Sequence, residues 1–377
     1  MRPLKVCMMI DRAFLGGGQR NVLALTGQLD RERFAVTVCS RPDGPLAEAV
    51  QAGGGTHLAV PFRKRFDRRI LRRIRDILRA EGFDILHTHG GVAGFYGRWA
   101  AQPRRVPVVI HTFHGIHYLH DTNPVVKAAL AGLERRLSRK TDAVVCVSDS
   151  VRDLSRAFRL VPEDRLTVIK NGIDFDRARP PETDEFRSVL SGLGLDSGGP
   201  LIGTVARLDP VKGLAVLLRA VPRIRERQPS ARFVIVGGGA EKARLEALAR
   251  DLGVRECVHF VGERTDAQAW IGRFDVFVLP SLQEALPYVI LEAAALEKPV
   301  AASEVGGIRE LVRNEETGLL VPPGEPEALA AAVIRLAENP VLAEHLGRKL
   351  RSSLAQEYTL TRMVRRTEDL YLRLASK

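Results

Sequence analysis

The stretch DVFVLPSLQEALPYVILEAAA, residues 275–295, contains in one unit the pattern that decides the fold. An apolar run of strand length, 275–279, is followed by a short loop and then by an apolar segment of helical character. Pro287 suits the first turn of that helix, so Glu284 is expected in the loop and Glu292 within the helix. Helical periodicity would separate residues eight apart by about 80°, so the two carboxylates need not act as a pair.

The same alternation of apolar strand and helix runs through the whole chain. Strands are expected at 4–10, 34–39, 56–60, 84–87, 107–111 and 143–147, and again at 201–205, 232–236, 257–261, 275–279 and 299–302. Helices are expected near 18–29, 66–80, 92–101, 124–140 and 149–158. Apolar strands joined by helical crossovers are typical of parallel sheets covered on both faces. We therefore predict an α/β fold of two doubly wound, Rossmann-like domains.

The two predicted domains are 1–180 and 181–358, separated by a stretch rich in proline and glycine. The sequence leaves open whether the last helix, 359–377, packs back on the first domain. Ligands of open α/β sheets bind outside the carboxyl ends of the strands, so we expect the domains to face each other across a cleft that holds the site.

Composition excludes several classes of protein. The 377 residues are 45% hydrophobic and 27% charged, as in a globular protein of two domains rather than a disordered or fibrous chain. No apolar run approaches the roughly 18 residues of a membrane span, and the first residues lack a secretory leader, which predicts a cytoplasmic protein. The four cysteines form no C-x-x-C pair, so reduced core thiols are favoured over disulfides or zinc ligands.

The net charge of +12 is unevenly distributed. Residues 1–185 hold 31 Lys/Arg against 21 Asp/Glu, and residues 186–377 hold 26 against 24. The segment 63–79 alone has nine basic and two acidic residues, and its Phe66, Ile70, Ile74 and Ile77 mark one apolar face. This segment is either a sheet-covering helix with a solvated basic side or a surface that attracts anionic lipid headgroups. Nucleic acid is not expected, because aromatics are only 6% and no nucleic-acid motif is present.

Two further segments suit anionic ligands. Gly16-Gly17-Gly18 follows the first strand and opens a helix, where backbone N–H groups can meet an anion, although a plain turn fits equally well. Arg207 leaves the end of a strand, and Lys212 is expected in the first turn of the next helix. Two cations at one strand end suit a diphosphate better than they suit a solvated surface.

Taken in order, these motifs resemble one family. They are Gly16–Gly18, HTFHG at 111–115, VSDS at 147–150, NGID at 171–174, Arg207 with Lys212, Gly237-Gly238, Glu284 with Glu292, and GGIRE at 306–310. The set resembles a retaining GT-B glycosyltransferase of the glycosyltransferase family 4 kind over nearly the whole chain.

The resemblance implies a role for each site residue. The catalytic residues would be His114, Arg207, Lys212 and Glu284. The donor would be bound by Gly17, Gly18, Arg207, Lys212, Gly238, Glu284, Ala285, Leu286 and Glu292. Among these, Glu292 would hold the ribose, Glu284 the donor sugar, and Arg207 with Lys212 the diphosphate. The 181–358 domain would thus bind the donor, and the 1–180 domain would lie on the acceptor side.

The activity implied is transfer with retention of a hexosyl or N-acetylhexosaminyl group to a glycan or lipid-linked acceptor, in polysaccharide or glycolipid synthesis. UDP is the expected nucleotide by family frequency only, no metal or other cofactor is expected, and the basic segment 63–79 would favour attachment to the inner face of the cytoplasmic membrane. Two alternatives stay open: a non-catalytic nucleotide-sugar-binding scaffold, and a same-fold epimerase or phosphorylase.

Two patterns suggest a metal but are set aside. His111, His114, His117 and His120 recur every three residues, yet no cysteine or paired carboxylate lies nearby to complete a coordination sphere. Asp174-x-Asp176 follows Asn171-Gly172, where a turn is expected.

Two residues depart from the family's common pattern. Gln19 stands where an acidic residue often follows the glycine loop, and Ala285 stands where glycine commonly follows the glutamate. Alanine is less free to adopt a positive φ, so we expect a slightly narrower donor pocket.

Overall fold

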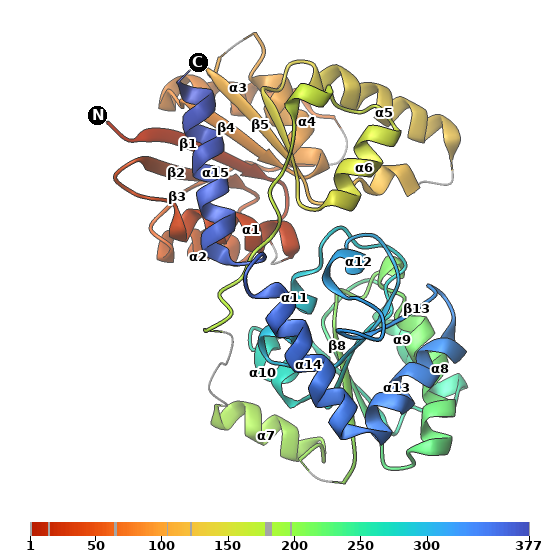
Figure 1. Ribbon diagram of the computed structural model, residues 1–377. Helices are drawn as coiled ribbons and strands as arrows, with labels where there is room; N and C mark the ends of the chain where they lie inside the picture. The colour runs from red at the N-terminus through yellow and green to blue at the C-terminus, as the bar shows by residue number, and fades with distance from the viewer. Residues whose placement is uncertain are drawn as a thin grey trace. The chain divides into compact units, whose positions relative to one another are not determined.

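The computed structural model describes residues 2–13, 16–63, 66–103, 105–120, 123–177, 183–196 and 198–376. The chain forms two compact units. Figure 1 shows the first in red to yellow-green together with the blue C-terminal helix, and the second in green to blue. The first comprises Met1–Asn171 and Leu360–Lys377, and the second comprises Gly172–Thr359. The boundary expected at 180/181 lies in residues 178–182, outside the described residues.

The first unit is built on a parallel sheet with the strand order β3-β2-β1-β4-β5-β6-β7. Its strands are β1 (Leu4–Ile10), β2 (Phe34–Ser40), β3 (Thr56–Ala59), β4 (Ile85–His89), β5 (Val108–Phe113), β6 (Ala143–Cys146) and β7 (Leu166–Val168). Its α-helices are α1 (Gly17–Gln28), α2 (Leu46–Ala52), α3 (Arg68–Glu81), α4 (Gly91–Ala100), α5 (Pro124–Ser138), α6 (Asp149–Ala157) and α15 (Leu360–Ala375).

The second unit is built on a parallel sheet with the strand order β10-β9-β8-β11-β12-β13. Its strands are β8 (Leu201–Val205), β9 (Arg232–Val236), β10 (Val258–Gly262), β11 (Val276–Leu279), β12 (Val300–Ser303) and β13 (Leu319–Val321). Its α-helices are α7 (Asp184–Gly192), α8 (Leu214–Arg227), α9 (Lys242–Asp251), α10 (Ala267–Arg273), α11 (Tyr288–Ala295), α12 (Ile308–Leu311), α13 (Pro326–Glu338) and α14 (Pro340–Leu354).

Both sheets are doubly wound, as predicted. In each sheet the first strand lies inside, the next two strands extend to one side, and the chain then crosses to the other side. This order creates a switch point between β1 and β4 in the first unit and between β8 and β11 in the second. Crevices at the carboxyl ends of strands beside such switch points are the usual ligand sites of open α/β sheets.

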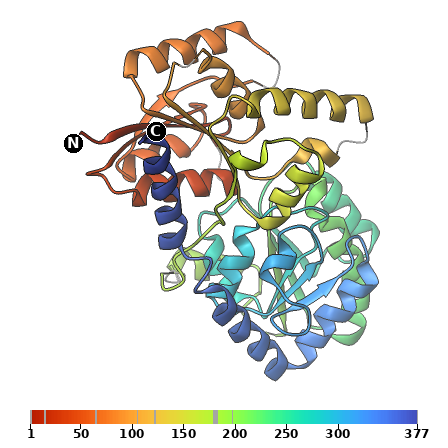
Figure 2. The same cartoon turned by 45° about the horizontal axis from the view of Figure 1, so that its top comes forward.

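Apolar residues cover both faces of the first sheet. On one face α3 and α4 pack through Ile74 and Tyr96, and on the other α1 and α15 pack through Val22 and Tyr371. The last helix, whose place the sequence leaves open, therefore belongs to the first unit, where Figure 2 shows it in blue.

The strands and helices expected from the sequence are present, each within two residues of its predicted ends. The strands β7 and β13 and the helix α2 were not predicted, because segments of three to seven residues are too short to show a clear hydrophobic period. For the second unit, no helix ranges were predicted apart from the helices expected after Lys212 and at Pro287. No helix within the described residues is both long and apolar enough to cross a membrane.

The basic segment 63–79 differs in part from its prediction. The helix begins at Arg68, because the Asp67 side chain accepts a hydrogen bond from the Arg69 N–H and caps it. Ile70, Ile74 and Ile77 are buried as predicted. Phe66 lies before the cap and is 47% exposed, so it is not part of the apolar face. Residues 64 and 65 lie outside the described residues.

Candidate active site

The loop that carries Glu284 follows β11 and is hydrogen-bonded to a neighbouring loop on each side. The Leu282 N–H donates to the Val211 carbonyl, 2.8 Å away in the loop after β8. The Gly307 N–H donates to the Glu284 carbonyl, 3.2 Å away across the loop after β12. The strands β8, β11 and β12 are neighbours in the sheet, so three adjacent strand ends hold Glu284 in place.

Glycines make this close approach of backbones possible. A Cβ atom at Gly307 would lie 1.8 Å from the Ala285 carbonyl oxygen, and one at Gly306 would lie 1.9 Å from that of Glu284. Gly306 also has a φ of +43°, in the left-handed region that favours glycine. The Gly306-Gly307 pair therefore positions the Glu284 loop through direct backbone packing.

Glu284 and Lys212 form a largely buried ion pair. The Lys212 Nζ lies 2.7 Å from the Glu284 Oε1, and the side chains are 19% and 8% exposed. The Ser281 hydroxyl, 2.8 Å away, donates to the same oxygen. The sequence singled out the two charged residues but not Ser281, whose hydroxyl is recognisable only once the turn of the loop is known.

Lys212 does not lie in the first turn of a helix, contrary to the prediction. It ends a short 3-10 turn, Pro210–Lys212, and α8 begins at Leu214. Gly213 separates the two with a φ of +62°, and a Cβ atom there would lie 2.0 Å from the Pro280 carbonyl oxygen. A helix cannot run through a left-handed residue, so Lys212 stays in the loop.

Arg207 has a different acidic partner. It leaves the end of β8, is 46% exposed, and lies 2.8 Å from the Asp209 carboxylate. The structure therefore brings Lys212 and Glu284 together directly, whereas Arg207 pairs within its own loop.

The other donor-binding candidates surround the same strand ends. Glu292 is buried within α11, and Leu286 is buried in the loop before that helix. The Gly238 carbonyl accepts a hydrogen bond from the Leu208 N–H, which joins the loops after β8 and β9. Ala285 is not among the non-glycine residues with positive φ in the described chain, so its backbone conformation suits alanine.

His114 and the glycine loop lie together in the first unit. A Cβ atom at Gly18 would lie 3.3 Å from the His114 Cδ2, so the glycine leaves room for the imidazole. Gly17 begins α1, and the side chain of no residue caps this helix terminus within the described chain. Its first N–H groups are oriented as an anion site requires.

A buried group of histidines supports His114. The His114 Nε2 lies 3.0 Å from the His89 Nδ1, with the two rings stacked 5.3 Å apart. The His87 Nδ1 lies 2.6 Å from the Tyr371 hydroxyl of α15. Burial, reinforced by neighbouring histidines, lowers the pKa of His87 to about 3 and the pKa of His89 well below its usual range. Both rings are therefore neutral at pH 7.

His111 and Asp174, which belong to the two patterns set aside as metal-like, form hydrogen bonds within the chain. The His111 Nδ1 lies 2.9 Å from the Thr88 hydroxyl, and the side chains of His117 and His120 lie outside the described residues. The Asp174 carboxylate accepts the N–H groups of Asp176 and Arg177, which makes the turn that was predicted. No group of three His, Cys, Asp or Glu side chains in the described chain is arranged to hold a metal ion.

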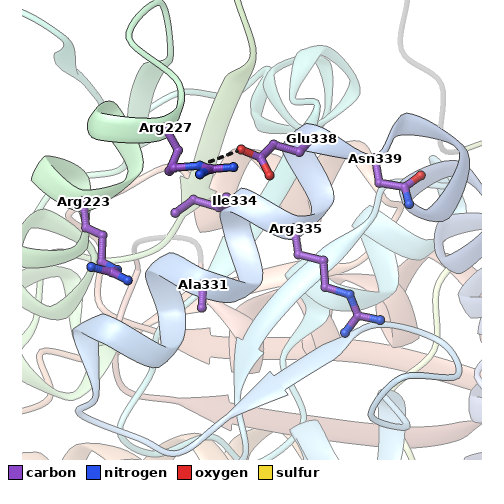
Figure 3. A pocket seen from close by; sticks show the side chains of 7 residues that line it. All are labelled: Arg223, Arg227, Ala331, Ile334, Arg335, Glu338 and Asn339. Carbon is purple, nitrogen blue, oxygen red and sulfur yellow. Dashed lines mark hydrogen bonds and ion pairs between the residues drawn. The ribbon is translucent and has the colours of Figure 1, made fainter.

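A pocket of about 440 Å³ lies elsewhere in the second unit, between α8 and α13 (Figure 3). Its Arg223 and Arg227 lie at the end of α8 remote from Lys212, and none of the predicted site residues lines it. Each of its arginines has an acidic partner, with Arg227 3.1 Å from Glu338. We interpret it as a charge-compensated groove between helices.

Comparison with known proteins identifies the family. Residues 15–177 match the family model described as Glycosyltransferase Family 4, and residues 199–339 match the one described as Glycosyl transferases group 1. An uncharacterized glycosyltransferase of Methanocaldococcus jannaschii is 30% identical over 78% of this chain and 76% of its own. The chain belongs to glycosyltransferase family 4.

One further sequence relative and one solved structure resemble this chain over nearly its whole length. The UDP-Gal:alpha-D-GlcNAc-diphosphoundecaprenol alpha-1,3-galactosyltransferase of Escherichia coli is 28% identical over 98% of this chain and 97% of its own. The crystal structure of Anabaena HepE in complex with UDP and glucose has a TM-score of 0.84 at 20% identity, covering 97% of this chain and 99% of the other. The fold is the GT-B fold of two Rossmann-like domains, and the family 4 glycosyltransferase transfers a sugar from a nucleotide-sugar donor.

Proposed function

We propose that this glycosyltransferase transfers a hexosyl or N-acetylhexosaminyl group, with retention and without a metal, from a UDP-sugar to a lipid-linked or glycan acceptor. The observation that carries the proposal is the Lys212–Glu284 pair held at the switch point of the second sheet. Its E. coli relative is named for UDP-galactose and a diphosphoundecaprenol-linked acceptor, which supports both halves of the proposal. The product enters polysaccharide or glycolipid synthesis.

The second unit binds the donor in this proposal. Lys212 binds the diphosphate as a point charge, and Arg207 binds it through its planar guanidinium. Arg207 must exchange Asp209 for a phosphate oxygen, and this exchange costs little because exposed ion pairs contribute only about 0–1 kcal/mol. The buried Glu292 of α11 holds the ribose hydroxyls.

Glu284 orients the donor sugar rather than attacking it. Its Oε1 accepts hydrogen bonds from both Lys212 and Ser281, so we assign its Oε2 to a sugar hydroxyl. A carboxylate engaged in this way is a poor nucleophile, which favours a mechanism without a glycosyl-enzyme intermediate. The role that we assign to His114 is contact with the transferred sugar, as the family resemblance implies.

Transfer then proceeds by substitution on one face of the sugar. The bond from the anomeric carbon to the diphosphate oxygen breaks, and the acceptor oxygen forms a new bond on the same face. The departing diphosphate takes the acceptor proton. Arg207 and Lys212 stabilise the charge that develops on the diphosphate, which makes them catalytic as well as binding residues.

The activity is tested by measuring nucleotide diphosphate release from a panel of nucleotide sugars, with and without an acceptor extract. A glycosyltransferase of this kind releases UDP rapidly only when acceptor is present. Product without acceptor would indicate an epimerase, dependence on inorganic phosphate would indicate a phosphorylase, and binding of UDP without turnover would indicate a scaffold.

We also propose that this protein is cytoplasmic and attaches peripherally to the inner face of the cytoplasmic membrane through α3. Its exposed arginines are Arg68, Arg69, Arg72, Arg73 and Arg79. The apolar face of α3 packs in the core, so attraction to anionic lipid is electrostatic rather than by insertion of the helix. Beside it, the half-exposed rings of Phe66 and Trp99 stack 5.6 Å apart and suit the membrane interface.

Flotation with anionic and neutral vesicles tests the attachment. The variant Arg68→Gln/Arg69→Gln/Arg72→Gln/Arg73→Gln is expected to lose flotation with anionic vesicles. The control Arg219→Gln/Arg244→Gln/Arg250→Gln/Arg348→Gln makes the same charge change on exposed residues of the second unit and should retain it. Equal binding of the unaltered protein to both vesicles would rule out the electrostatic mechanism.

A further inference from the structure

A second cavity, of about 280 Å³, lies within the first unit and has no role in the function proposed so far. It is lined by Asp11, Arg12, Arg41, Phe62, Arg63 and Val92. These residues follow β1, β2 and β3 or begin α4 after β4, so the cavity lies at the carboxyl ends of four neighbouring strands. This is the edge at which a doubly wound sheet binds ligands.

The cavity is rich in guanidinium groups. Arg41 lies beside Asp43, with its Nε 2.9 Å from one carboxylate oxygen. Arg12 and Arg63 are exposed and form no ion pair with any described residue. Guanidinium groups match phosphate oxygens in pairs of parallel hydrogen bonds, so this set suits a phosphate group.

The loops that carry Arg12 and Arg41 are hydrogen-bonded to each other or to α1 before any ligand binds. The buried Gln19 side chain donates to the Arg12 carbonyl, 3.1 Å away. The Leu46 N–H, just after the Arg41 loop, donates to the Ala13 carbonyl, 3.2 Å away. Less ordering is therefore left to occur on binding, which favours affinity. A carboxylate at position 19 could not donate this bond to the carbonyl, whereas the Gln19 amide does.

Two further features define the ligand. Gly90 precedes the ten-residue helix α4 and, as a glycine, offers no side chain to cap it. The first N–H groups of α4, beside Val92 in the cavity wall, therefore favour binding of an anion. Asp11 is half-buried in the wall, and burial raises its pKa from the usual value. A carboxylate repels phosphate but accepts hydrogen bonds from hydroxyl groups, so it favours a ligand that has both groups.

We propose that this cavity binds a sugar phosphate portion of the acceptor, with Arg12, Arg41 and Arg63 on the phosphate and Asp11 on a sugar hydroxyl. The proposal rests on the glycosyltransferase function proposed above and names the chemical class of its acceptor. A volume of about 280 Å³ is near the lower end of ligand sites, about 300–1,000 Å³, as suits one sugar phosphate.

Calorimetry with soluble probes tests the site. Glucose 1-phosphate, N-acetylglucosamine 1-phosphate, inorganic phosphate and methyl glucoside are titrated into the full chain in saturating UDP, so that the expected diphosphate site is filled. At least one sugar phosphate is expected to bind more tightly than inorganic phosphate or methyl glucoside. Failure of both sugar phosphates to bind would overturn the proposal.

Paired variants assign the residues. Arg12→Gln/Arg63→Gln is expected to weaken sugar phosphate binding at least tenfold, whereas Arg136→Gln/Arg139→Gln, an equal charge change on exposed residues at the C-terminal end of α5, should leave it unaltered. Asp11→Asn is expected to weaken sugar phosphate binding but to strengthen binding of inorganic phosphate, because a like charge is removed. Equal weakening by the two arginine pairs, or a parallel change of both probes in Asp11→Asn, would contradict the assignment.

Two readouts separate this inference from its alternatives. Flotation with anionic vesicles should be unchanged in Arg12→Gln, whose substitution lies outside the basic segment 63–79, because the cavity binds an acceptor phosphate and not a lipid surface; a loss of flotation would assign Arg12 to the membrane instead. UDP affinity and acceptor-dependent UDP release test the proposed function independently. Suppose that the unaltered protein binds UDP and releases it in response to acceptor, but that Arg12→Gln/Arg63→Gln binds sugar phosphate as tightly as the unaltered protein. Then the inference about the cavity fails and the proposed function stands.

Discussion

The two units share one strand order around their switch points, yet their polar groups are positioned in different ways. In the second unit, glycines let loops pack backbone against backbone, and Lys212 and Glu284 meet as a buried ion pair. In the first, the polar side chains support one another, as His87 and His89 do beneath His114. The topology thus determines where a site lies, and the local sequence determines which chemistry occupies it.

The two units also differ in how their charges are compensated. Beside the strand ends of the second unit, Arg207 and Lys212 each contact a carboxylate. In the first unit, Arg12 and Arg63 contact none among the described residues. We infer that Arg207 of the second unit exchanges an internal partner for the ligand, whereas the first unit presents arginines that have no ion pair with any described residue to exchange.

The largest expected effect comes from removing the cations of the second unit. Arg207→Ala and Lys212→Ala should each reduce turnover by about 10²–10³-fold, because each removes a group that stabilises the leaving diphosphate. Steady-state UDP release with saturating acceptor measures this effect.

The two variants should differ in stability. Arg207 is 46% exposed, so its loss leaves the melting temperature nearly unchanged. Lys212→Ala leaves Glu284 buried without its cation and should lower the melting temperature, and Lys212→Ala/Glu284→Gln should recover part of that loss without recovering turnover. Near-normal turnover in Arg207→Ala would refute its catalytic role.

The backbone contacts of the second unit can be broken by one methyl group. In Gly307→Ala the new Cβ would lie 1.8 Å from the Ala285 carbonyl oxygen, so the Glu284 loop must move. We expect a loss of about 1–3 kcal/mol in the free energy of unfolding, as for other overpacked sites, with at least tenfold lower turnover. Gly272→Ala in α10 is the control, because its Cβ meets no atom within 4 Å. Normal turnover in Gly307→Ala would show that the loop tolerates displacement.

The buried histidines make the first unit sensitive to acid. The pKa of His87 is lowered from 6.5 to about 3, so between those pH values the unfolded chain binds more protons than the folded chain. Above about pH 6.5 the neutral His87 ring costs the folded state nothing. As the pH falls below that value, the free energy of unfolding decreases by at most about 1.4 kcal/mol per pH unit. His89 and His111 shift in the same direction.

Hydrogen exchange, corrected for intrinsic rates, measures this difference between the units. Amides of β4 and β5 should lose more protection between pH 7 and pH 5 than amides of β11 and β12. His87→Gln should reduce the difference, and His345→Gln on the surface of α14 is the matched control. Equal losses in both sheets would show that these histidines do not govern acid stability.

Much of the fold was predictable because apolar strands and helical segments alternate with clear periods. The Glu284 loop and its position before α11 followed from Pro287, and the GGIRE segment belonged to the family's motif order. The partners of the site residues were not predictable. Ser281 contacts Glu284 because of how the loop turns, and His89 contacts His114 because their strands are neighbours in the sheet. Neither arrangement can be derived from a single sequence.

The predictions that Lys212 lies in a helix and that Phe66 belongs to the apolar face of one were wrong for a related reason. Periodicity extended each helix one or two residues too far, and the ends are set by local features: the left-handed Gly213 in one case and the Asp67 cap in the other. Element ends depend on such single residues more than on any repeating pattern.

The smallest expected effect tests how closely the second unit's loop determines donor choice. Ala285 needs no positive φ, so Ala285→Gly should only increase the freedom of the unfolded chain and lower the free energy of unfolding by about 0.4–1 kcal/mol. Its carbonyl still faces Gly307, so the loop keeps its position and turnover with the best donor should change less than threefold. Relative rates with UDP-glucose, UDP-galactose and their N-acetylated counterparts measure specificity. If Ala285 narrows the donor pocket, as expected from the sequence, then Ala285→Gly should raise the rates of the N-acetylated donors most, because these donors are the bulkiest. An unchanged order of donors would place the determinant of donor choice outside this loop.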